Sequence, residues 1–341
     1  MPRFFIPKAC KDVLLAPWFE LSQEHILFKE GLPENFFKKA ERVEDPAQAQ
    51  AIILPNNFRT SNPDTEVYIK KYADLAAQFT IPIYAFSLGD YTDTVHFDPR
   101  IKVFRLSVYR SNLLPNTILM PTLVEDIGRL GIQIREKRDI SIVSFCGKAG
   151  FSSFRETFAS YARYLFYRVL SIFNPPLRAR IRGIFWRKWI MTACAGSPLV
   201  KTNFILRNTF SGARSTIEVS PDTARKEFID SMTQSDFVLT PKGDGNYSNR
   251  FIETLCMGRI PVLVDTDVIL PFEDKVNYSQ IVVRVPMNQV TRAPQYIKDF
   301  YNALSAEEWK TRQQLAREVF ERYLRQDSFF KTYFSQNLIE S

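Results

Sequence analysis

The sequence predicts an α/β protein made of two Rossmann-like αβα domains, because of its length and the alternation of its apolar segments. A chain of 341 residues is long for one hydrophobic core and comfortable for two domains. Apolar, β-branched runs alternate with amphipathic helical segments, which is typical of parallel sheets covered by helices. A hydrophobic content of 45%, with 14% aromatic residues, excludes a disordered chain.

The first predicted domain, residues 1–139, begins with the apolar run KDVLLAP and a helical segment expected over 34–49. A buried strand over 51–55 precedes an amphipathic helix over 67–79, which leads into the strand IPIYAF. IKVFRLSV and NTILMP are further strand candidates. This order predicts a parallel, helix-covered sheet.

The second predicted domain, residues 140–305, begins with the strand in DISIVSFCGKAG and a helix over 151–165. TNFILRNTF, FVLTP and IPVLV continue as strands, and RKEFIDSMTQS is a helix between two of them. The terminal segment, 306–341, contains a long amphipathic helix and is expected to pack back toward the N-terminal domain.

The segment from Ser235 to Phe272 combines a strand, a glycine-bearing loop, a helix and a second strand. Such a loop brings a ligand to the positive end of a helix, where free N–H groups bind phosphate. Arg250 adds a planar fork of donors, and Glu253 shares its helix face and can accept from a hydroxyl. The pattern suits a sugar nucleotide, while a surface ion pair in an ordinary α/β unit is the alternative.

This segment resembles the donor-binding signature of the exostosin family of glycosyltransferases. The matching residues are Pro241, Gly243, Arg250, Glu253, Gly258, Ile260, Pro261, Val262, Pro271 and Phe272. VEDPAQAQAIILP, NTILMP, and SIVSFCGKAG with Arg155 are similar to further family segments. Departures are Gln50, where the family has aspartate, and Asn116 and Thr117, where it has Lys-Asp.

The resemblance implies a GT-B-like fold, in which two Rossmann-like αβα domains face each other across a cleft. It implies that 1–139 serve the acceptor and 140–305 bind the nucleotide sugar, with a UDP-linked donor and inversion at the anomeric carbon. It implies an enzyme that transfers the sugar to a hydroxyl of a glycan or lipid-linked glycan acceptor, with no cofactor and no metal. A catalytically inactive nucleotide-sugar-binding partner subunit of the same fold is the alternative, and measuring UDP release from UDP-sugars would separate the two.

A nucleoside diphosphate carries negative charge, so its site should collect cations and helix N-termini. Arg250 is assigned to the diphosphate and Glu253 to the ribose hydroxyls. Ser248 and Asn249 either bind phosphate or cap the helix. The remaining donor-site candidates come from the neighbouring loop and strand ends: Lys242, Gly243, Lys148, Arg155 and Arg207.

Inverting transfer needs a general base on the acceptor hydroxyl. Asp90 is the candidate chosen, because it follows the strand IPIYAF at a glycine turn. The other residues considered are Glu20, Glu24, His25, Asp93, His96, Glu125 and Asp126. Asp265 and Asp267 form an Asp-x-Asp, which holds a metal in other glycosyltransferases, and they are interpreted here as a loop beside the sugar.

A basic aromatic insertion near 161–190 is the second unusual feature. No Asp or Glu occurs between 157 and 217, a stretch with ten Lys and Arg residues in a chain of net charge +8. Residues Tyr161–Trp189 fit an interfacial segment on anionic lipid, a nucleic-acid surface, or a helix packed on the donor domain with its arginines in water. Membrane contact is retained among the expected partners, and nucleic acid is not.

The four cysteines are scattered and indicate neither a metal cluster nor a disulfide framework. The N-terminal residues show no signal-peptide pattern, and no apolar run reaches the ~20 residues of a membrane-spanning helix. Eukaryotic members of the family that this chain resembles usually carry an N-terminal anchoring helix. Beside that resemblance, the missing pattern leads us to expect a cytoplasmic protein of a bacterium or virus, or a trimmed chain, peripheral at the inner face of a membrane.

Overall fold

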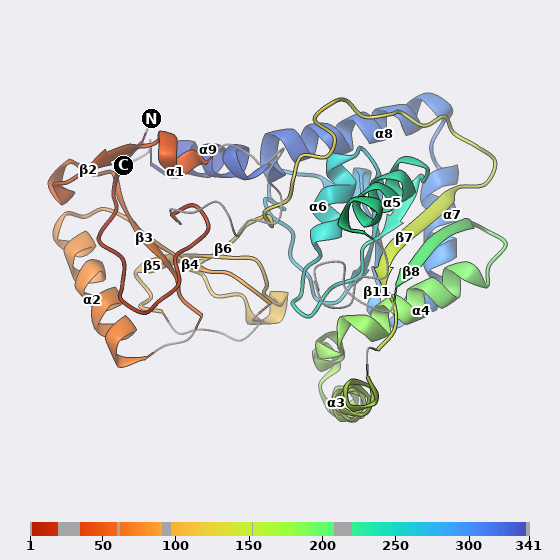
Figure 1. Cartoon of the computed structure of the whole chain (residues 1–341), viewed down its shortest axis with the longest axis horizontal. Helices are drawn as coiled ribbons and strands as arrows, with labels where there is room; N and C mark the ends of the chain where they lie inside the picture. Colours follow the sequence, from red (N-terminus) through yellow and green to blue (C-terminus); the bar gives the residue numbers. More distant parts are fainter. Residues whose placement is uncertain are drawn as a thin grey trace. The chain divides into compact units, whose positions relative to one another are not determined.

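The computed structural model of the chain describes residues 2–19, 35–59, 62–90, 97–151, 153–207 and 220–338. It divides into two units (Figure 1). The first comprises Met1–Glu125, Ile269–Phe272 and Glu321–Ser341, and the second comprises Asp126–Val268 and Glu273–Phe320.

The division falls at residues 125 and 126, whereas the sequence placed a boundary near 139. Arg135 explains the difference, because its side chain forms an ion pair of 2.8 Å with Asp236 and its N–H donates to Gln313, both in the second unit. The terminal segment also divides, since 306–320 belong to the second unit and the residues from 321 onward belong to the first.

The first unit contains a six-stranded parallel sheet in the order β2-β1-β3-β4-β5-β6. Its strands are β1 (Arg3–Phe5), β2 (Glu41–Val43), β3 (Ala51–Asn57), β4 (Ile83–Ser87), β5 (Ile101–Arg105) and β6 (Thr117–Leu119). Its helices are α1 (Phe36–Lys39), α2 (Pro63–Gln78) and α9 (Gln326–Asn337), with 3-10 turns at Pro46–Gln48 and Arg110–Asn112. The predicted parallel sheet is therefore confirmed.

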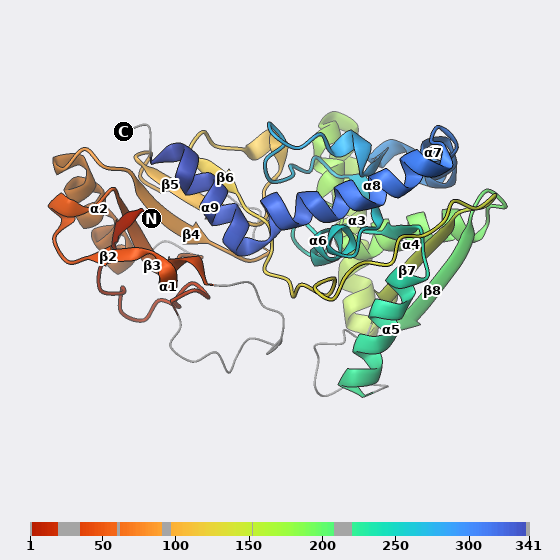
Figure 2. The same cartoon turned by 90° about the horizontal axis from the view of Figure 1, so that it is seen from above.

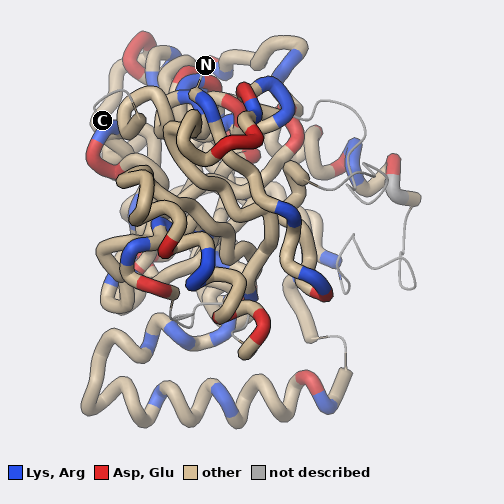
Figure 3. Tube along the Cα trace, turned by 90° about the vertical axis from the view of Figure 1, so that its left-hand side faces the viewer, with Lys and Arg blue, Asp and Glu red and all other residues tan. Residues whose placement is uncertain are grey.

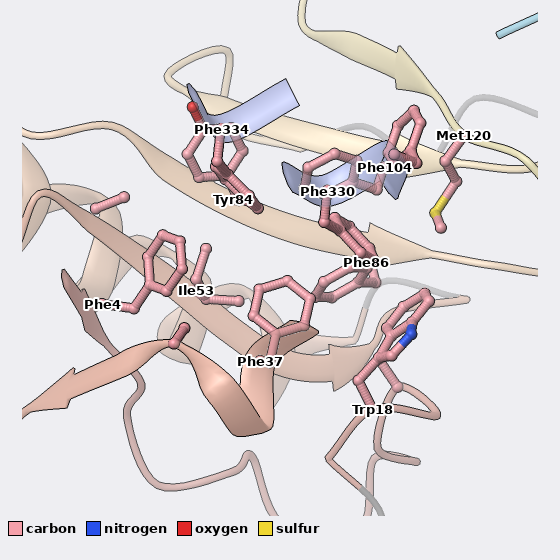
Figure 4. Packing of buried hydrophobic residues seen from close by; sticks show 14 of the residues in the cluster. Phe4, Trp18, Phe37, Ile53, Tyr84, Phe86, Phe104, Met120, Phe330 and Phe334 are labelled. Carbon is pink, nitrogen blue, oxygen red and sulfur yellow. The ribbon is translucent and has the colours of Figure 1, made fainter. Parts of the chain in front are cut away.

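Both faces of this sheet are covered, as alternation along its strands requires. Ile52 and Leu54 of β3 pack toward α2, whereas Ile53 packs toward α1 and α9. Figure 4 shows the second of these cores, a dense aromatic cluster in which the Phe37 and Phe330 rings lie 4.8 Å apart. Helix α9, from the far end of the chain, thus completes the core of the first unit.

The helix predicted over residues 34–49 is wrong. The segment forms the four-residue α1, the edge strand β2 and a 3-10 turn. Asp45 precedes Pro46, which disfavours helical backbone at Asp45, and pairing of β2 with β1 supplies the competing hydrogen bonds.

The second unit contains a five-stranded parallel sheet in the order β11-β10-β9-β7-β8. Its strands are β7 (Ile142–Lys148), β8 (Lys201–Arg207), β9 (Phe237–Leu239), β10 (Ile260–Asp265) and β11 (Val283–Pro286). Its helices are α3 (Phe154–Phe173), α4 (Gly183–Ala195), α5 (Pro221–Thr233), α6 (Asn249–Cys256), α7 (Ala293–Asn302) and α8 (Ala306–Val319). Short turns are η4 (Pro175–Arg180), η5 (Tyr278–Gln280) and η6 (Met287–Arg292), and a π-helical turn, η7 (Phe320–Leu324), follows α8.

Helices lie on both faces of this sheet as well (Figure 2). Val238 packs with Met232 at the end of α5 and Met257 after α6. The next side chain along β9, Phe237, points the other way, with its ring 5.8 Å from Tyr301 of α7 and 5.4 Å from Trp309 of α8. The result is the αβα arrangement predicted for this part of the chain.

The basic aromatic stretch divides between two different environments. Helix α4 belongs to the core, with Trp186, Ile190 and Cys194 fully buried. Helix α3 packs on it through Tyr164, whose ring stacks on Phe185 at 4.9 Å, and leaves most of its other side chains exposed. Of the alternatives for Tyr161–Trp189, a helix packed on the donor domain describes α4, whereas α3 is the part that presents an exposed face.

Candidate functional site

The candidate site lies at the carboxyl ends of β7 and β9, where the strand order of the second unit reverses. The chain runs from β7 outward to β8, then returns to the other side of β7 with β9, β10 and β11. In doubly wound sheets this reversal is where the loops diverge and ligands bind. β7 ends at Lys148, and β9 leads into the loop that contains Gly243.

Arg250, in the first turn of α6, crosses from the β9 side to β7. Its Nη2 donates to the carbonyl oxygen of Cys146 at 2.6 Å, and its guanidinium lies over the Phe145 ring at 4.4 Å. Its Nε is buried without a hydrogen-bond partner. In the described part of the chain, no carboxylate lies within ion-pair distance of Arg250.

Burial lowers the pKa of Arg250, and the nearby Glu253 opposes that shift. A guanidinium is weakly hydrated and stays charged when partly buried, so this positive charge is under-compensated in a low dielectric. An anion placed here would gain more than it would from an exposed arginine.

Gly147 makes the approach of Arg250 to β7 possible. A Cβ on this residue would lie 2.8 Å from Arg250 Nη2, and its φ of 150° is one that other residues rarely adopt. The glycine therefore serves close approach as well as backbone conformation.

The N-terminus of α6 faces the same strand ends. Ser248 is the N-cap residue, but its side chain makes no capping hydrogen bond, and Asn249 is exposed at the first helical position. Ser248 thus occupies the N-cap position without giving the first N–H groups of α6 a side-chain acceptor. Asn246 holds the preceding loop in place, because its side-chain amide bonds both Thr266 and the Asp267 carbonyl.

Lys148 and Arg187 add positive charge beside Arg250. Lys148 is buried and its ammonium lies 3.3 Å from Glu156 at the start of α3. Arg187 of α4 donates to the Lys148 carbonyl oxygen at 3.4 Å. Burial lowers the pKa of Arg187 to about 10, and repulsion from Arg250 adds to this shift.

Arg187 was missed by the sequence reasoning. It lies in the run FWRKW, for which none of the three sequence-based alternatives placed an arginine at the donor site. Its place at the site follows from the packing of α4, whose first residue, Gly183, meets the 242–243 loop so closely that a Cβ would lie 2.2 Å from the Lys242 carbonyl oxygen. No local pattern in the sequence signals that contact.

Glu253 lies at the site with 15% of its side chain exposed and a long contact of 3.9 Å to Arg225. Arg207 forms a closer ion pair, 2.6 Å, with Glu227 of α5, which neutralises its charge. Arg155 lies exposed on the first turn of α3.

Lys242 is buried and turned away from the strand ends. Its Nζ donates to the carbonyl oxygen of Ala179 at 2.6 Å, so it ties the 242–243 loop to η4. Burial lowers its pKa to about 7, with a further lowering by Arg163. Gly243 closes the loop by donating its N–H to the Tyr247 carbonyl at 2.9 Å.

Asp265 pairs with Arg284 at 3.3 Å and accepts from the Val268 N–H. Among the described residues, no group of three or more His, Cys, Asp or Glu side chains is arranged to hold a metal ion. The described cysteines at 10, 146, 194 and 256 are all buried and free.

The candidates for the catalytic base lie in different parts of the structure. Asp90 is exposed after β4, next to Gly89 with φ 136°. Asp126 is buried in the second unit and bonded by Arg317 at 2.5 and 3.0 Å, so it is committed to a structural ion pair. Glu20, Glu24, His25, Asp93 and His96 lie outside the described residues.

Fold and site together define a doubly wound α/β unit with a cationic cluster at its switch point, the place where such units bind phosphate-bearing ligands. Residues 178–300, about a third of the chain, match the family model described as the Exostosin GT47 domain. This part of the chain is similar to the exostosin domain, and the matched residues include Arg187, Arg250 and Glu253.

Curated relatives match over short segments. The Exostosin-1 homolog of Caenorhabditis elegans is 30% identical over 101 residues, which is 30% of this chain and 25% of that protein. A protein named "Probable glucuronosyltransferase" from Oryza sativa subsp. japonica is 35% identical over 65 residues, 19% of this chain and 15% of its own. The chain thus spans a quarter or less of the length of these two relatives.

Among solved structures, an α-glucosyltransferase in complex with UDP-glucose and DNA matches with a TM-score of 0.38 and 11% identity, over 99% of both chains. WaaG, a glycosyltransferase involved in lipopolysaccharide biosynthesis, matches with a TM-score of 0.35 and 7% identity, over 84% of this chain and 90% of that one. Likeness at this level is too distant to define a ligand. Within the described residues, no helix is both long enough and apolar enough to cross a bilayer.

Proposed function

We propose that the protein is a glycosyltransferase that moves a sugar from a nucleoside-diphosphate donor, with UDP as the nucleotide, to a hydroxyl of a glycan or lipid-linked acceptor. The observation that carries the proposal is Arg250: a partly buried guanidinium, without a carboxylate partner among the described residues, at the strand ends of a doubly wound sheet. The exostosin domain match supports the same chemistry.

In this proposal the donor diphosphate lies against the N-terminus of α6. N–H groups at the start of α6, which receive no capping bond from the Ser248 side chain, and the Ser248 hydroxyl donate to its oxygens, and Arg250 supplies a bidentate fork. Arg187 and Lys148 lower the electrostatic cost of the negative charge that develops on the leaving diphosphate. These cations are proposed to take the part that a divalent metal plays in other glycosyltransferases, so chelation should leave turnover intact.

Glu253 is proposed to accept hydrogen bonds from the ribose hydroxyls. It lies three residues after Arg250 on α6, and its contact to Arg225 at 3.9 Å is long enough to be exchanged. If so, wild-type protein prefers UDP to 2′-deoxy-UDP, and Glu253→Ala removes that preference. Equal affinities of the wild type for both nucleotides would exclude this role.

Asp90 is proposed as the base that takes the proton from the acceptor hydroxyl. The acceptor oxygen then attacks the anomeric carbon as the bond to the diphosphate breaks, which inverts the configuration at that carbon. The Asp90 carboxylate is exposed at the carboxyl end of β4, where it has room to accept that proton. Asp90→Asn should retain UDP binding and lose turnover.

UDP-glucuronate is the first donor to test, because several of the matching relatives carry the name glucuronosyltransferase. The decisive experiment incubates the protein with a panel of UDP-sugars and hydroxyl acceptors and measures UDP release. The proposal expects acceptor-dependent release that Arg250→Ala abolishes and Arg138→Ala retains. Arg138 is a matched control because it comes before the amino end of β7, whereas the candidate site lies at the carboxyl end of that strand.

The alternative is a nucleotide-sugar-binding partner subunit without catalysis. UDP binding that depends on Arg250, with no release from any donor and acceptor pair, would favour it. Loss of both binding and release would reject the donor site itself.

A further inference from the structure

Helix α3 is twenty residues long and carries an apolar stripe that the second unit leaves uncovered. The stripe follows helical spacing along one face, and its exposed members are Phe154 (84%), Phe158 (71%), Leu165 (58%), Val169 (54%) and Ile172 (69%). Phe166 and Phe173 extend it at its margin, with 58% and 84% of their surface exposed. Contiguous apolar surface of this kind marks an interaction site.

The orientation of α3 is fixed by its opposite face. Ser160 and Ser171 are buried there, and Tyr164 stacks on Phe185 of α4 at 4.9 Å. The helix thus packs inward through small and aromatic residues and directs its aliphatic and phenylalanine side chains outward. A rotation that buried the stripe would break these contacts.

The net charge of α3 is positive, and basic positions are spread along the helix (Figure 3). Arg155, Arg163 and Arg168 are exposed, whereas the one acidic residue, Glu156, is held by Lys148 and Arg182. No other Asp or Glu follows before residue 218. An apolar face bordered by arginines is complementary to lipid tails beneath anionic headgroups.

We propose that α3 lies in the plane of an anionic membrane surface, with Phe158, Leu165 and Ile172 inserted among the acyl chains. Its length of about 30 Å, at 1.5 Å rise per residue, gives the stripe several insertion points along one plane. A second copy of the same helix fits less well, because two such faces would bring Arg163 and Arg168 together without acids to pair them. Nucleic acid fits less well, because Val169 and Ile172 offer nothing to a phosphate backbone.

Membrane binding by α3 does not depend on the proposed sugar transfer, since only the side chains of α3 are required for it. Helix α3 and the candidate site are linked by a side-chain contact, in which Lys148 of the site donates to Glu156 in the first turn of α3. A membrane-bound α3 would therefore hold that site beside a lipid surface.

The test uses the full chain and vesicles of phosphatidylcholine, with and without phosphatidylglycerol. Wild-type protein should sediment with the anionic vesicles, less with the neutral ones, and less again as salt rises. The variant Phe158→Ser, Leu165→Ser, Ile172→Ser should bind on the order of 100-fold more weakly, because three large apolar side chains no longer enter the bilayer. The control Val67→Ser with Leu130→Ser changes side chains that are 70% and 94% exposed elsewhere, and it should bind as wild type.

A second measurement reports on α3 directly. Because the four native cysteines are buried, Phe158→Cys can be labelled with an environment-sensitive fluorophore, with Val67→Cys as the control. When anionic vesicles are added, the fluorescence emission of the label at position 158 should shift to shorter wavelength, whereas that of the label at position 67 should not. Unchanged vesicle binding by the triple variant, or no shift from the label at 158, would overturn the proposal. So would self-association or nucleic-acid binding that the triple variant abolishes while vesicle binding is absent.

Discussion

The Nη2 atom of Arg250 lies 2.6 Å from the carbonyl oxygen of Cys146, so the first turn of α6 is bonded to the carboxyl end of β7. The two residues are 104 positions apart, and the contact crosses the point where the strand order of the second unit reverses. It places a positive charge at the carboxyl ends of the strands, where a doubly wound sheet receives a ligand.

Gly147→Ala tests whether the close approach of the Arg250 guanidinium to β7 contributes to UDP binding. The new Cβ would meet Arg250 Nη2 at 2.8 Å and must adopt a φ of 150°, so the guanidinium should be displaced. We expect UDP affinity to fall about 10-fold and stability to fall by about 1 kcal/mol. Calorimetry and thermal melting measure the two effects.

Gly150→Ala is the matched control, since no atom lies within 4 Å of a Cβ there. It should leave UDP affinity unchanged. If Gly147→Ala also kept wild-type affinity, the close approach of Arg250 to β7 would have no part in binding.

The ion pair between Arg317 and Asp126 should stabilise the second unit. Both side chains are largely buried, and the guanidinium also donates to the Cys256 carbonyl at 2.9 Å. Arg317→Met should lower the free energy of unfolding by about 3 kcal/mol, because it removes the guanidinium that donates to both oxygens of the buried Asp126 carboxylate. Arg317→Met combined with Asp126→Asn should cost less than the two single changes added together.

Urea denaturation of the four proteins measures this coupling. Arg100→Gln, which removes an exposed ion pair with Asp74 and Asp98, should change the midpoint far less. Strict additivity of the Arg317 and Asp126 changes would show that the pair contributes nothing as a pair.

Lys242 should make stability rise with pH above neutrality. Burial lowers its folded pKa to about 7, whereas the unfolded chain keeps the ordinary value of 10.5. Between these values the unfolded state holds a proton that the folded state has lost, so raising the pH favours folding; below pH 7 this contribution is constant. From pH 7 to pH 8 the gain should be about 1 kcal/mol.

Unfolding of the wild type and of Lys242→Met at the two pH values tests this expectation. The gain should vanish in Lys242→Met and persist in Lys226→Met, which changes an exposed lysine on α5. The same pH dependence in all three proteins would contradict a lowered pKa at Lys242.

The sequence predicted those parts of the fold in which local pattern and tertiary structure agree. The strands around Ile53 and Val262 were found because buried parallel strands form continuous β-branched runs. The helix of Arg250 was found because a glycine-bearing loop and Gly258 bound it. The segment 34–49 was misassigned, because pairing of Glu41–Val43 with β1 is a long-range contact.

In the candidate site, too, local sequence pattern predicted residues of one element but not residues brought in by long-range packing. Arg250 and Glu253 share one short helix, so their spacing alone placed them together. Arg187 comes from another helix and reaches the site through the packing of Gly183 on the 242–243 loop. Arg207 was chosen for its position after a strand, and its partner Glu227 was not foreseeable from the sequence.

Calorimetry of UDP binding to wild type, Arg250→Ala and Arg138→Ala tests the central claim most directly. Losing the fork at Arg250 should weaken binding about 100-fold, or about 3 kcal/mol, with the fold intact by circular dichroism, while Arg138→Ala binds as wild type. Wild-type affinity in a folded Arg250→Ala protein would show that the cationic cluster at the switch point is not the nucleotide site.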